Sequence, residues 1–439
     1  MSEPVLGLLS FLVLFVLIAL RMPVGLAMFV CGTGGYVMIV GWAPFLAYIK
    51  TTPYFLFSNY TLSVIPLFIL MGAFAERIGL SQALFTAANV FVGHRRGGMA
   101  MAAIGACAGF GAICGSSVAT TATMGRAAFP QLRRYGYADS LSTGTLAAGG
   151  TLGILIPPSV ILIIYAISTE QNIAKLFMAA LVPGLMAAAF YMIAIAWTVR
   201  RDPAAGPAGP QVVGAERREA LVEVWPVMLL AVLVVGGIYG GVFSPTEGAA
   251  IGAVGTALIG LAHRRLGWAE IRGSLIQTAE LSAMIFFVLL GAAVFNSFMT
   301  LSELPFEAAD FISELDLPPH FILIAILLVY IVLGGVMDEL AMILLTLPVF
   351  FPIVMALDFG LTPEETAIWF GILVLIIVGV GLTSPPIGLN VFVISAIARD
   401  VPITATYRGV LPFIFMDIVR LALVGAFPAL ALVVVRLLS

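Results

Sequence analysis

Glycine and hydroxyl residues gather in the first half of the chain, next to a proline pair. Residues 111–123 read GAICGSSVATTAT, and residues 149–159 contain Pro157 and Pro158. Proline has no backbone N–H and disfavours helix in the residue before it, so the pair leaves carbonyl oxygens without helical partners. Freed carbonyls beside hydroxyl groups make an all-oxygen cage suited to a hard monovalent cation.

A second set of stretches repeats this design near the C-terminus. Residues 334–340 read GGVMDEL, and residues 381–390 read GLTSPPIGLN, with Thr383, Ser384 and Asn390 as polar groups. Ends of half-helices add negative potential at their C-termini and favour anions at their N-termini. The two sets together predict a coupled cation and an anionic substrate that share one region, although either set alone would be a weak signal.

Four charged residues within apolar stretches allow more than one interpretation. Asp338 is either a cation ligand or substrate-side charge, or the N-cap of the following helix. Its neighbour Glu339 faces a cavity or solvent. Asp417 and Arg420 are three residues apart and share a helix face, so an ion pair that holds helices together is favoured over a role in translocation.

The sequence lacks the residue patterns that metal sites and enzymes would require. The cysteines and histidines show no metal-ligand spacing, and no zinc-protease, Walker or Gly-x-Gly-Asp motif is present. These residues are Cys31, Cys107, Cys114, His94, His263 and His320. The sequence therefore predicts no enzyme and no nucleic-acid partner.

The composition predicts an all-α polytopic membrane protein. The 439 residues are 62% hydrophobic and 10% charged, whereas soluble domains are about 25% charged. The first apolar run has no basic segment before it, so we expect a retained helix instead of a signal peptide. Spans are expected near residues 4–21, 23–41, 61–77, 140–167, 173–200, 224–242, 246–262, 274–298, 364–398 and 409–437.

Two further segments are too short to be pairs of spans. The arms 98–112 and 116–129, and likewise 320–334 and 338–352, hold about 15 residues each. At 1.5 Å per residue an arm reaches about 22 Å, short of a bilayer core of about 30 Å. Each segment is therefore predicted to be a re-entrant helical hairpin, over residues 98–129 and 320–352, next to a broken helix at 140–167 or 364–398.

The two halves of the chain resemble each other. Pro157-Pro158 recurs as Pro385-Pro386, and other matches lie 219 to 228 residues apart, such as Gly72 with Gly291. We expect a first repeat at 1–201, a cytoplasmic linker at 202–223 and a second repeat at 224–439. Five spans and a hairpin per repeat make the second copy inverted, which is an architecture of secondary transporters.

Basic residues set the expected orientation. If the first hairpin opens to the cytoplasm, 16 of the 20 Lys and Arg residues fall on that side, as the positive-inside rule requires. Both termini are then periplasmic, in a multi-pass protein of the bacterial inner membrane.

These motifs resemble a known family. The strings GSSVA at 115–119, GTLGILIPPS at 150–159 and SPPIGLN at 384–390 are similar to the large membrane subunit of tripartite ATP-independent periplasmic (TRAP) transporters, the DctM type. The resemblance covers nearly the whole chain. It implies sodium-driven import of an organic acid by elevator-type movement, in a fold of the ion-transporter superfamily. It also implies a small four-helix membrane subunit and a periplasmic substrate-binding protein as partners.

The resemblance also implies which residues bind Na⁺ and the organic anion. Sodium site one would use Ser116, Gly153, Ile156 and Pro158, and site two Gly335, Ser384, Ile387 and Gly388 with Thr383 adjacent. Substrate contacts are assigned to Ser117, Thr120, Thr121, Thr151, Asp338 and Asn390. Some relatives have aspartate where this chain has Thr120, which leaves the substrate class open.

Two other functions compete with the sodium-coupled permease. One is a stand-alone sodium/dicarboxylate symporter of similar repeat architecture, and the other is a non-transporting scaffold of a membrane enzyme complex. Transport of free substrate without a binding protein would favour the first. Activity that survives loss of the Ser116 and Ser384 hydroxyls would favour the second.

Overall fold

The computed structural model describes residues 2–211, 214–314 and 317–438, and every regular element in these ranges is a helix. The all-helical membrane fold is thus confirmed. The helices of the first half are α1 (Glu3–Ala19), α2 (Val24–Val40), α3 (Trp42–Phe57), η1 (Tyr60–Ser63), α4 (Val64–Arg77), α5 (Leu80–Val92), α6 (Gly98–Cys114), α7 (Ser117–Arg134), α8 (Asp139–Gly150), α9 (Leu152–Leu155), α10 (Val160–Ser168) and α11 (Ile173–Arg201).

The helices of the second half follow in the same general order as those of the first, and fewer of them are divided into short segments. Its helices are α12 (Ala215–Tyr239), α13 (Pro245–Ala262), α14 (Trp268–Leu301), α15 (Leu304–Glu314), α16 (Pro319–Gly334), α17 (Glu339–Ala356), α18 (Pro363–Thr383), α19 (Leu389–Ile397), α20 (Ile403–Ala426) and α21 (Ala429–Leu438). Eight helices in the described part of the chain are long and apolar enough to cross a membrane, or nine if the bent pair α8–α9 and α10 counts as one span.

The two expected hairpins are present as packed helix pairs. Helices α6 and α7 meet at Gly115 and Ser116, and α16 and α17 meet at residues 335–338. The first arms hold 17 and 16 residues, which corresponds to about 25 Å. These two first arms are therefore shorter than a bilayer core of about 30 Å, whereas the second arm α17, with 18 residues, is one of the eight helices long and apolar enough to cross.

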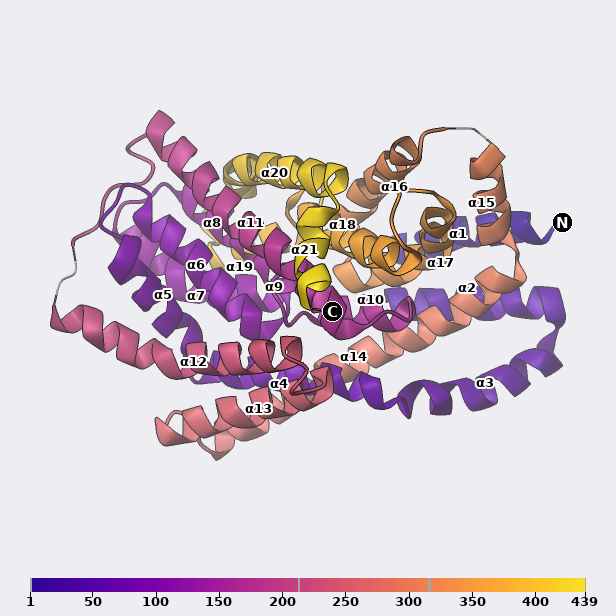
Figure 1. The fold of residues 1–439 in the computed structure, drawn as a ribbon, viewed down its shortest axis with the longest axis horizontal. Coiled ribbons are helices and arrows are strands. Elements are labelled where there is room, and N and C mark those ends of the chain that lie inside the picture. The colour runs from indigo at the N-terminus through magenta and orange to yellow at the C-terminus, as the bar shows by residue number, and fades with distance from the viewer. Residues whose placement is uncertain (1, 212–213, 315–316, 439) are drawn as a thin grey trace.

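The two halves are interleaved instead of lying side by side. Helix α2 packs against α14, α4 against α13, and α8 against α20 (Figure 1). Glycines allow these helices to approach closely. A Cβ atom on Gly291 would lie 2.1 Å from the carbonyl oxygen of Gly25, and one on Gly409 would lie 1.9 Å from that of Ser140. We call α2, α4, α13 and α14 the frame, and α6–α11 with α16–α21 the hairpin core.

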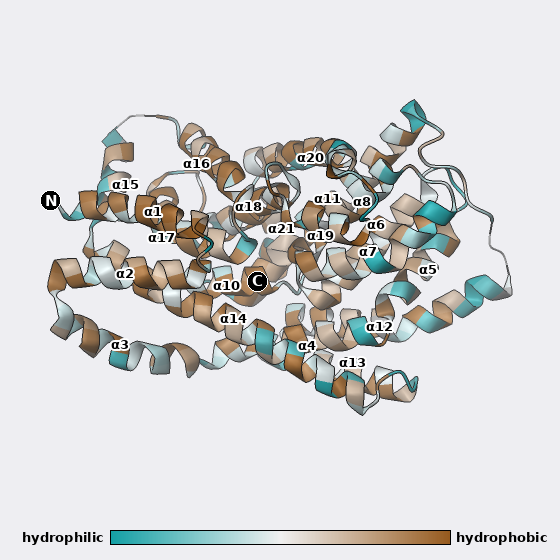
Figure 2. Cartoon of the chain, turned by 180° about the vertical axis from the view of Figure 1, so that it is seen from behind, coloured by the Kyte–Doolittle hydropathy of each residue, from teal (hydrophilic) through white to brown (hydrophobic). Residues whose placement is uncertain are grey.

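Polar residues mark the ends of this helical assembly. Figure 2 shows hydrophilic residues at the start of α12 and around the nearby ends of α5 and α7, whereas α1, α16 and α18 are mostly hydrophobic. Every residue of α18 from Thr366 to Thr383 is buried. This helix therefore forms the centre of the hairpin core.

Five parts of the fold differ from the sequence-based expectation. Helices α3, α5 and α15 lie outside the predicted spans. Helix α12 begins at Ala215, inside the expected linker, and the preceding segment is bound to the first half, since Gly97 N–H donates to the Gly206 carbonyl. The predicted span 409–437 is two helices, because a break at Phe427 and Pro428 separates α20 from α21.

Candidate functional site

Both proline pairs interrupt their helices, as the sequence predicted. Helix α9 ends at Leu155 and α10 begins at Val160, with a bend of 44° between them. Helix α18 ends at Thr383 and α19 begins at Leu389. The residues between the helices are therefore free to offer carbonyl oxygens to a ligand.

The first hairpin tip lies directly against the first break. Ser116 caps α7 and accepts a hydrogen bond from Ala119 N–H, while Val160 N–H donates to the Gly115 carbonyl at 3.3 Å. A Cβ atom on Gly153 would lie 2.6 Å from both the Ser116 carbonyl oxygen and Thr120 Oγ1. Only glycine at position 153 therefore lets the break approach the tip so closely.

Oxygen atoms gather at this tip, where the first sodium site is predicted. Thr120 Oγ1 is buried and has no hydrogen-bond partner among the described residues. The Pro158 carbonyl oxygen lies near Gly115, 2.9 Å from where a Cβ atom would be. The structure thus brings Ser116, Gly153 and Pro158 together, whereas the Ile156 side chain packs towards Gly184 of α11. Thr120, assigned to the substrate from the sequence, lies beside Gly153 of predicted site one.

The second tip repeats the arrangement. Ile387 N–H donates to the Gly335 carbonyl at 3.1 Å, which is the counterpart of the Val160–Gly115 bond. Gly388 has a positive φ of 58°, and a Cβ atom on it would lie 2.9 Å from the Ser384 carbonyl oxygen. Thr383 Oγ1 donates to the Val380 carbonyl at 3.0 Å.

One residue at the second break was missed in the sequence. The Tyr407 hydroxyl of α20 contacts the Ile387 carbonyl at 2.7 Å and the Pro386 carbonyl at 3.1 Å. The two carbonyl oxygens share the single hydroxyl proton of Tyr407. Without it they would be free to face a cation. Nothing in the sequence pairs Tyr407 with residues 20 positions earlier, because the contact depends on how α20 folds back.

Asp338 caps the second arm of its hairpin. Its Oδ1 accepts a hydrogen bond of 2.9 Å from Ala341 N–H, which is the capping interpretation. The second oxygen is left for another ligand, and both Asp338 and Glu339 line a cavity. Within the part of the chain that is described, no group of three His, Cys, Asp or Glu side chains is arranged to hold a metal ion.

The remaining predicted substrate residues fall into two buried groups. Asn390 Nδ2 of α19 donates to Ser117 Oγ at 2.8 Å and to the Ala147 carbonyl at 3.1 Å. Thr121 lies beside them, since its Oγ1 faces Gly150. All three side chains are fully buried and join α7, α8 and α19, and their assignment to the substrate stays a prediction.

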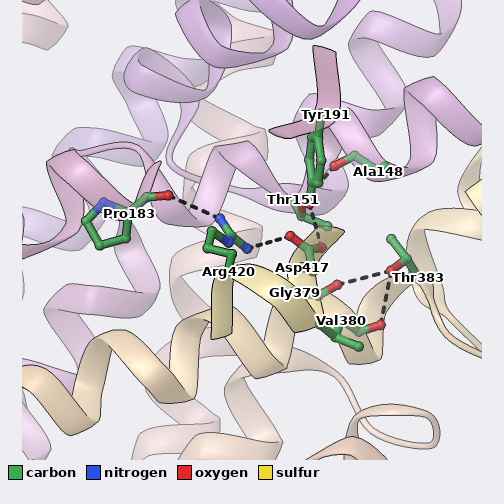
Figure 3. A network of polar contacts seen from close by, with 9 residues as sticks. All are labelled: Ala148, Thr151, Pro183, Tyr191, Gly379, Val380, Thr383, Asp417 and Arg420. Carbon is green, nitrogen blue, oxygen red and sulfur yellow. Dashed lines mark hydrogen bonds and ion pairs between the residues drawn. The ribbon is translucent and has the colours of Figure 1, made fainter. Parts of the chain in front are cut away.

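Thr151 belongs to a second network, drawn in Figure 3. Its Oγ1 lies 2.9 Å from the Tyr191 hydroxyl, which donates to Asp417 Oδ2 at 2.7 Å. Asp417 Oδ1 is 2.7 Å from Arg420 Nη2, and Arg420 also donates to the Pro183 carbonyl. The side chains of Asp417 and Arg420 are 3% and 0% exposed. The predicted intramembrane ion pair is thus present, and it holds α11 and α20 together.

A cavity of about 490 Å³ separates the hairpin tips from the frame. Helices α4 and α14 of the frame form one wall, and α7, α10, α17 and α19 of the hairpin core form the other. The residues that line it are Ile69, Gly72, Ala73, Glu76, Cys114, Gly115, Ser116, Val118, Ala119, Ala122, Thr123, Arg126, Val160, Ile161, Gln277, Leu281, Met284, Ile285, Asp338, Glu339, Leu340 and Leu389. Glu76, Arg126 and Gln277 were not predicted as site residues.

Comparison with known proteins supports a transporter assignment. Residues 11–430 match the family described as "Tripartite ATP-independent periplasmic transporter, DctM component". The C4-dicarboxylate TRAP transporter large permease protein DctM of Pseudomonas aeruginosa is 38% identical over 377 residues, which cover 85% of this chain and 86% of that protein. The ectoine TRAP transporter large permease protein TeaC of Halomonas elongata is 32% identical and covers 85% of each chain.

Two further comparisons concern chain organisation and fold. The isethionate TRAP transporter permease protein DctMQ of Oleidesulfovibrio alaskensis is 31% identical, covering 98% of this chain and 66% of that protein. The crystal structure of the Alcanivorax borkumensis YdaH transporter, described as having an unusual topology, aligns with a TM-score of 0.60 at 16% identity and covers 88% of this chain and 89% of that one. That likeness concerns the fold alone.

Proposed function

Because the chain belongs to the DctM family of TRAP transporter large permease subunits, we propose that it imports an organic acid together with Na⁺. The proposal depends most on one observation. In both halves a hairpin-tip carbonyl accepts a hydrogen bond from the segment that follows a proline pair, at Gly115 and at Gly335. Gly115 and Ser116 of the first tip and Asp338 of the second tip border one cavity. Broken helices near mid-membrane are where secondary transporters bind coupling ions and substrates.

The packing supports elevator-type movement of the hairpin core against the frame. The cavity lies between the two groups of helices. The hairpin core has its own buried network through Tyr191, Asp417 and Arg420, so it can move as one body. An anion bound between the tips and the frame would change its access when the core slides.

The proposed setting is a three-component system of the bacterial inner membrane, with both termini periplasmic. A small four-helix membrane subunit and a periplasmic substrate-binding protein would be the partners, and lipid would surround the apolar helices. The names of the relatives include transporters of C4-dicarboxylates, isethionate, ectoine and sialic acid. Succinate is therefore the first substrate to test for this chain.

Reconstitution tests the proposal. The chain and the small subunit would be placed in proteoliposomes with the binding protein outside, and uptake of radiolabelled succinate, isethionate and N-acetylneuraminate would be measured. We expect uptake of one of them only with an inward Na⁺ gradient and the binding protein. Equal uptake after replacement of Na⁺ by K⁺ would refute sodium coupling. Uptake of free substrate without the binding protein would favour the stand-alone symporter.

A further inference from the structure

The cavity carries an unusual charge for a site that accepts an anion. Among the described residues that line it, Arg126 is the one cation, whereas Glu76, Asp338 and Glu339 are acidic. An entering carboxylate would meet like charge from Glu76 and Asp338. The cation that compensates them is therefore a candidate for a direct role in anion binding.

Arg126 lies at the far end of the cavity from the hairpin tip. It follows Ser116 by ten residues on α7, which is about 15 Å along a helix. A four-carbon dicarboxylate is too short to bridge this distance. Arg126 is thus a separate position for the anion, reached after it leaves the tip or before it arrives there.

The ion pair of Arg126 leaves most of its guanidinium free. Nη2 contacts Glu76 Oε1 of α4 at 2.6 Å, and Arg126 forms no second ion pair with any residue that the structure describes. The side chains of Arg126 and Glu76 are 58% and 26% exposed. Exposed pairs add little stability, so another carboxylate can replace Glu76 at small cost. The buried Asp417–Arg420 pair, by contrast, is a structural link.

We infer that Arg126 binds the carboxylate of the transported anion at the mouth of the cavity, and that Glu76 occupies its guanidinium when the anion is absent. The inference rests on the proposed function, because it assumes an organic anion in this cavity. A guanidinium holds a carboxylate through two parallel hydrogen bonds. Glu76 therefore competes with the substrate for Arg126, and Arg126 links the hairpin core to the frame only while the substrate is elsewhere.

The test compares two variants that break the same ion pair. Arg126→Gln removes the anion ligand, whereas Glu76→Gln removes its competitor. Binding of radiolabelled succinate and N-acetylneuraminate, which both carry a carboxylate, to the purified full-length chain would be measured at equilibrium, and the anion that the wild type binds would be followed. We expect about tenfold weaker binding for Arg126→Gln, from the loss of a charge-assisted contact, and tighter binding for Glu76→Gln. Arg126→Lys should give an intermediate affinity.

Arg133→Gln serves as the matched control. Arg133 lies on the same helix, is 42% exposed and pairs with Asp139 and Asp400 outside the cavity, so its loss should leave affinity unchanged. Equal changes in affinity in the same direction for Arg126→Gln and Glu76→Gln would show that the ion pair only joins the hairpin core to the frame. That result would overturn the inference. Wild-type affinity in Arg126→Gln would overturn it too. Wild-type Na⁺-driven uptake in reconstituted Arg126→Gln would overturn the inference alone and leave the proposed function standing.

Discussion

Tyr191 donates a 2.7 Å hydrogen bond to Asp417, and through its own hydroxyl it also contacts Thr151 at 2.9 Å. A residue at the first helix break is thereby tied to an ion pair on α20. Because Gly153 follows Thr151 by two residues, this link fixes the position of the carbonyls next to candidate sodium site one.

Replacing Tyr191 with Phe should loosen this break. The change removes one hydrogen bond to a charged group, which is worth about 1.5–3 kcal/mol. We expect a lower thermal midpoint of unfolding and a higher Na⁺ concentration for half-maximal uptake. Tyr239→Phe, which removes a bond to the Phe177 carbonyl, should lower the midpoint without changing the Na⁺ dependence. A shift of equal size in both variants would argue against a positioning role.

We expect the effects on stability of replacing Asp417 and Arg420 to be strongly coupled. Asp417→Asn or Arg420→Met alone leaves one buried charge without a partner, which costs about 3–5 kcal/mol. The double variant should recover much of that loss. Chemical denaturation of the four proteins in detergent measures the coupling, and strictly additive losses would contradict it.

Two glycines of α20 should respond oppositely to alanine. A Cβ atom on Gly409 would lie 1.9 Å from the Ser140 carbonyl oxygen, whereas Gly425 has open space around it. Gly409→Ala should therefore push α20 away from α8 and abolish monodisperse protein in gel filtration. Gly425→Ala should fold and gain up to about 1 kcal/mol from helix propensity. Well-behaved Gly409→Ala protein would refute the close packing.

Thr120 should affect the Na⁺ dependence of uptake through its hydroxyl oxygen atom. Thr120→Val keeps the shape of the side chain but removes the unpartnered hydroxyl, while Thr120→Ser keeps the hydroxyl. We expect Thr120→Val to raise the Na⁺ concentration for half-maximal uptake by about tenfold, the usual effect of losing one contact to a charged group. Thr120→Ser should stay close to wild type. Identical behaviour of both variants would remove Thr120 from the cation cage.

Removing the Tyr407 hydroxyl should have the opposite effect at the second break, because it should strengthen the response to Na⁺. Tyr407→Phe leaves the Ile387 carbonyl without its hydroxyl partner, so the sodium-free protein should be less stable. Na⁺ can then satisfy that carbonyl. We expect a larger rise in thermal midpoint on replacing K⁺ with Na⁺ than in the wild type, and an unchanged rise would speak against a cation at this break.

Local signals explain what the sequence could predict. The hairpins and broken helices were predictable because glycine at the tips and paired prolines act on their own neighbours. Helices α3 and α5 were not, because at 16 and 13 residues they are shorter than a span. Arg126 was recognised only as a marker of orientation, since its contact with Glu76 joins helices 50 residues apart. Tyr407 was missed for the same reason.

The interleaving of α2 with α14, α4 with α13 and α8 with α20 also bears on biosynthesis. Each of these partners emerges from the ribosome only after more than 150 further residues have been made. The N-terminal helices must therefore wait in the bilayer with their glycine-lined faces against lipid, until the late helices insert between them. Assembly of this chain is thus a post-insertion event that depends on its last translated segment.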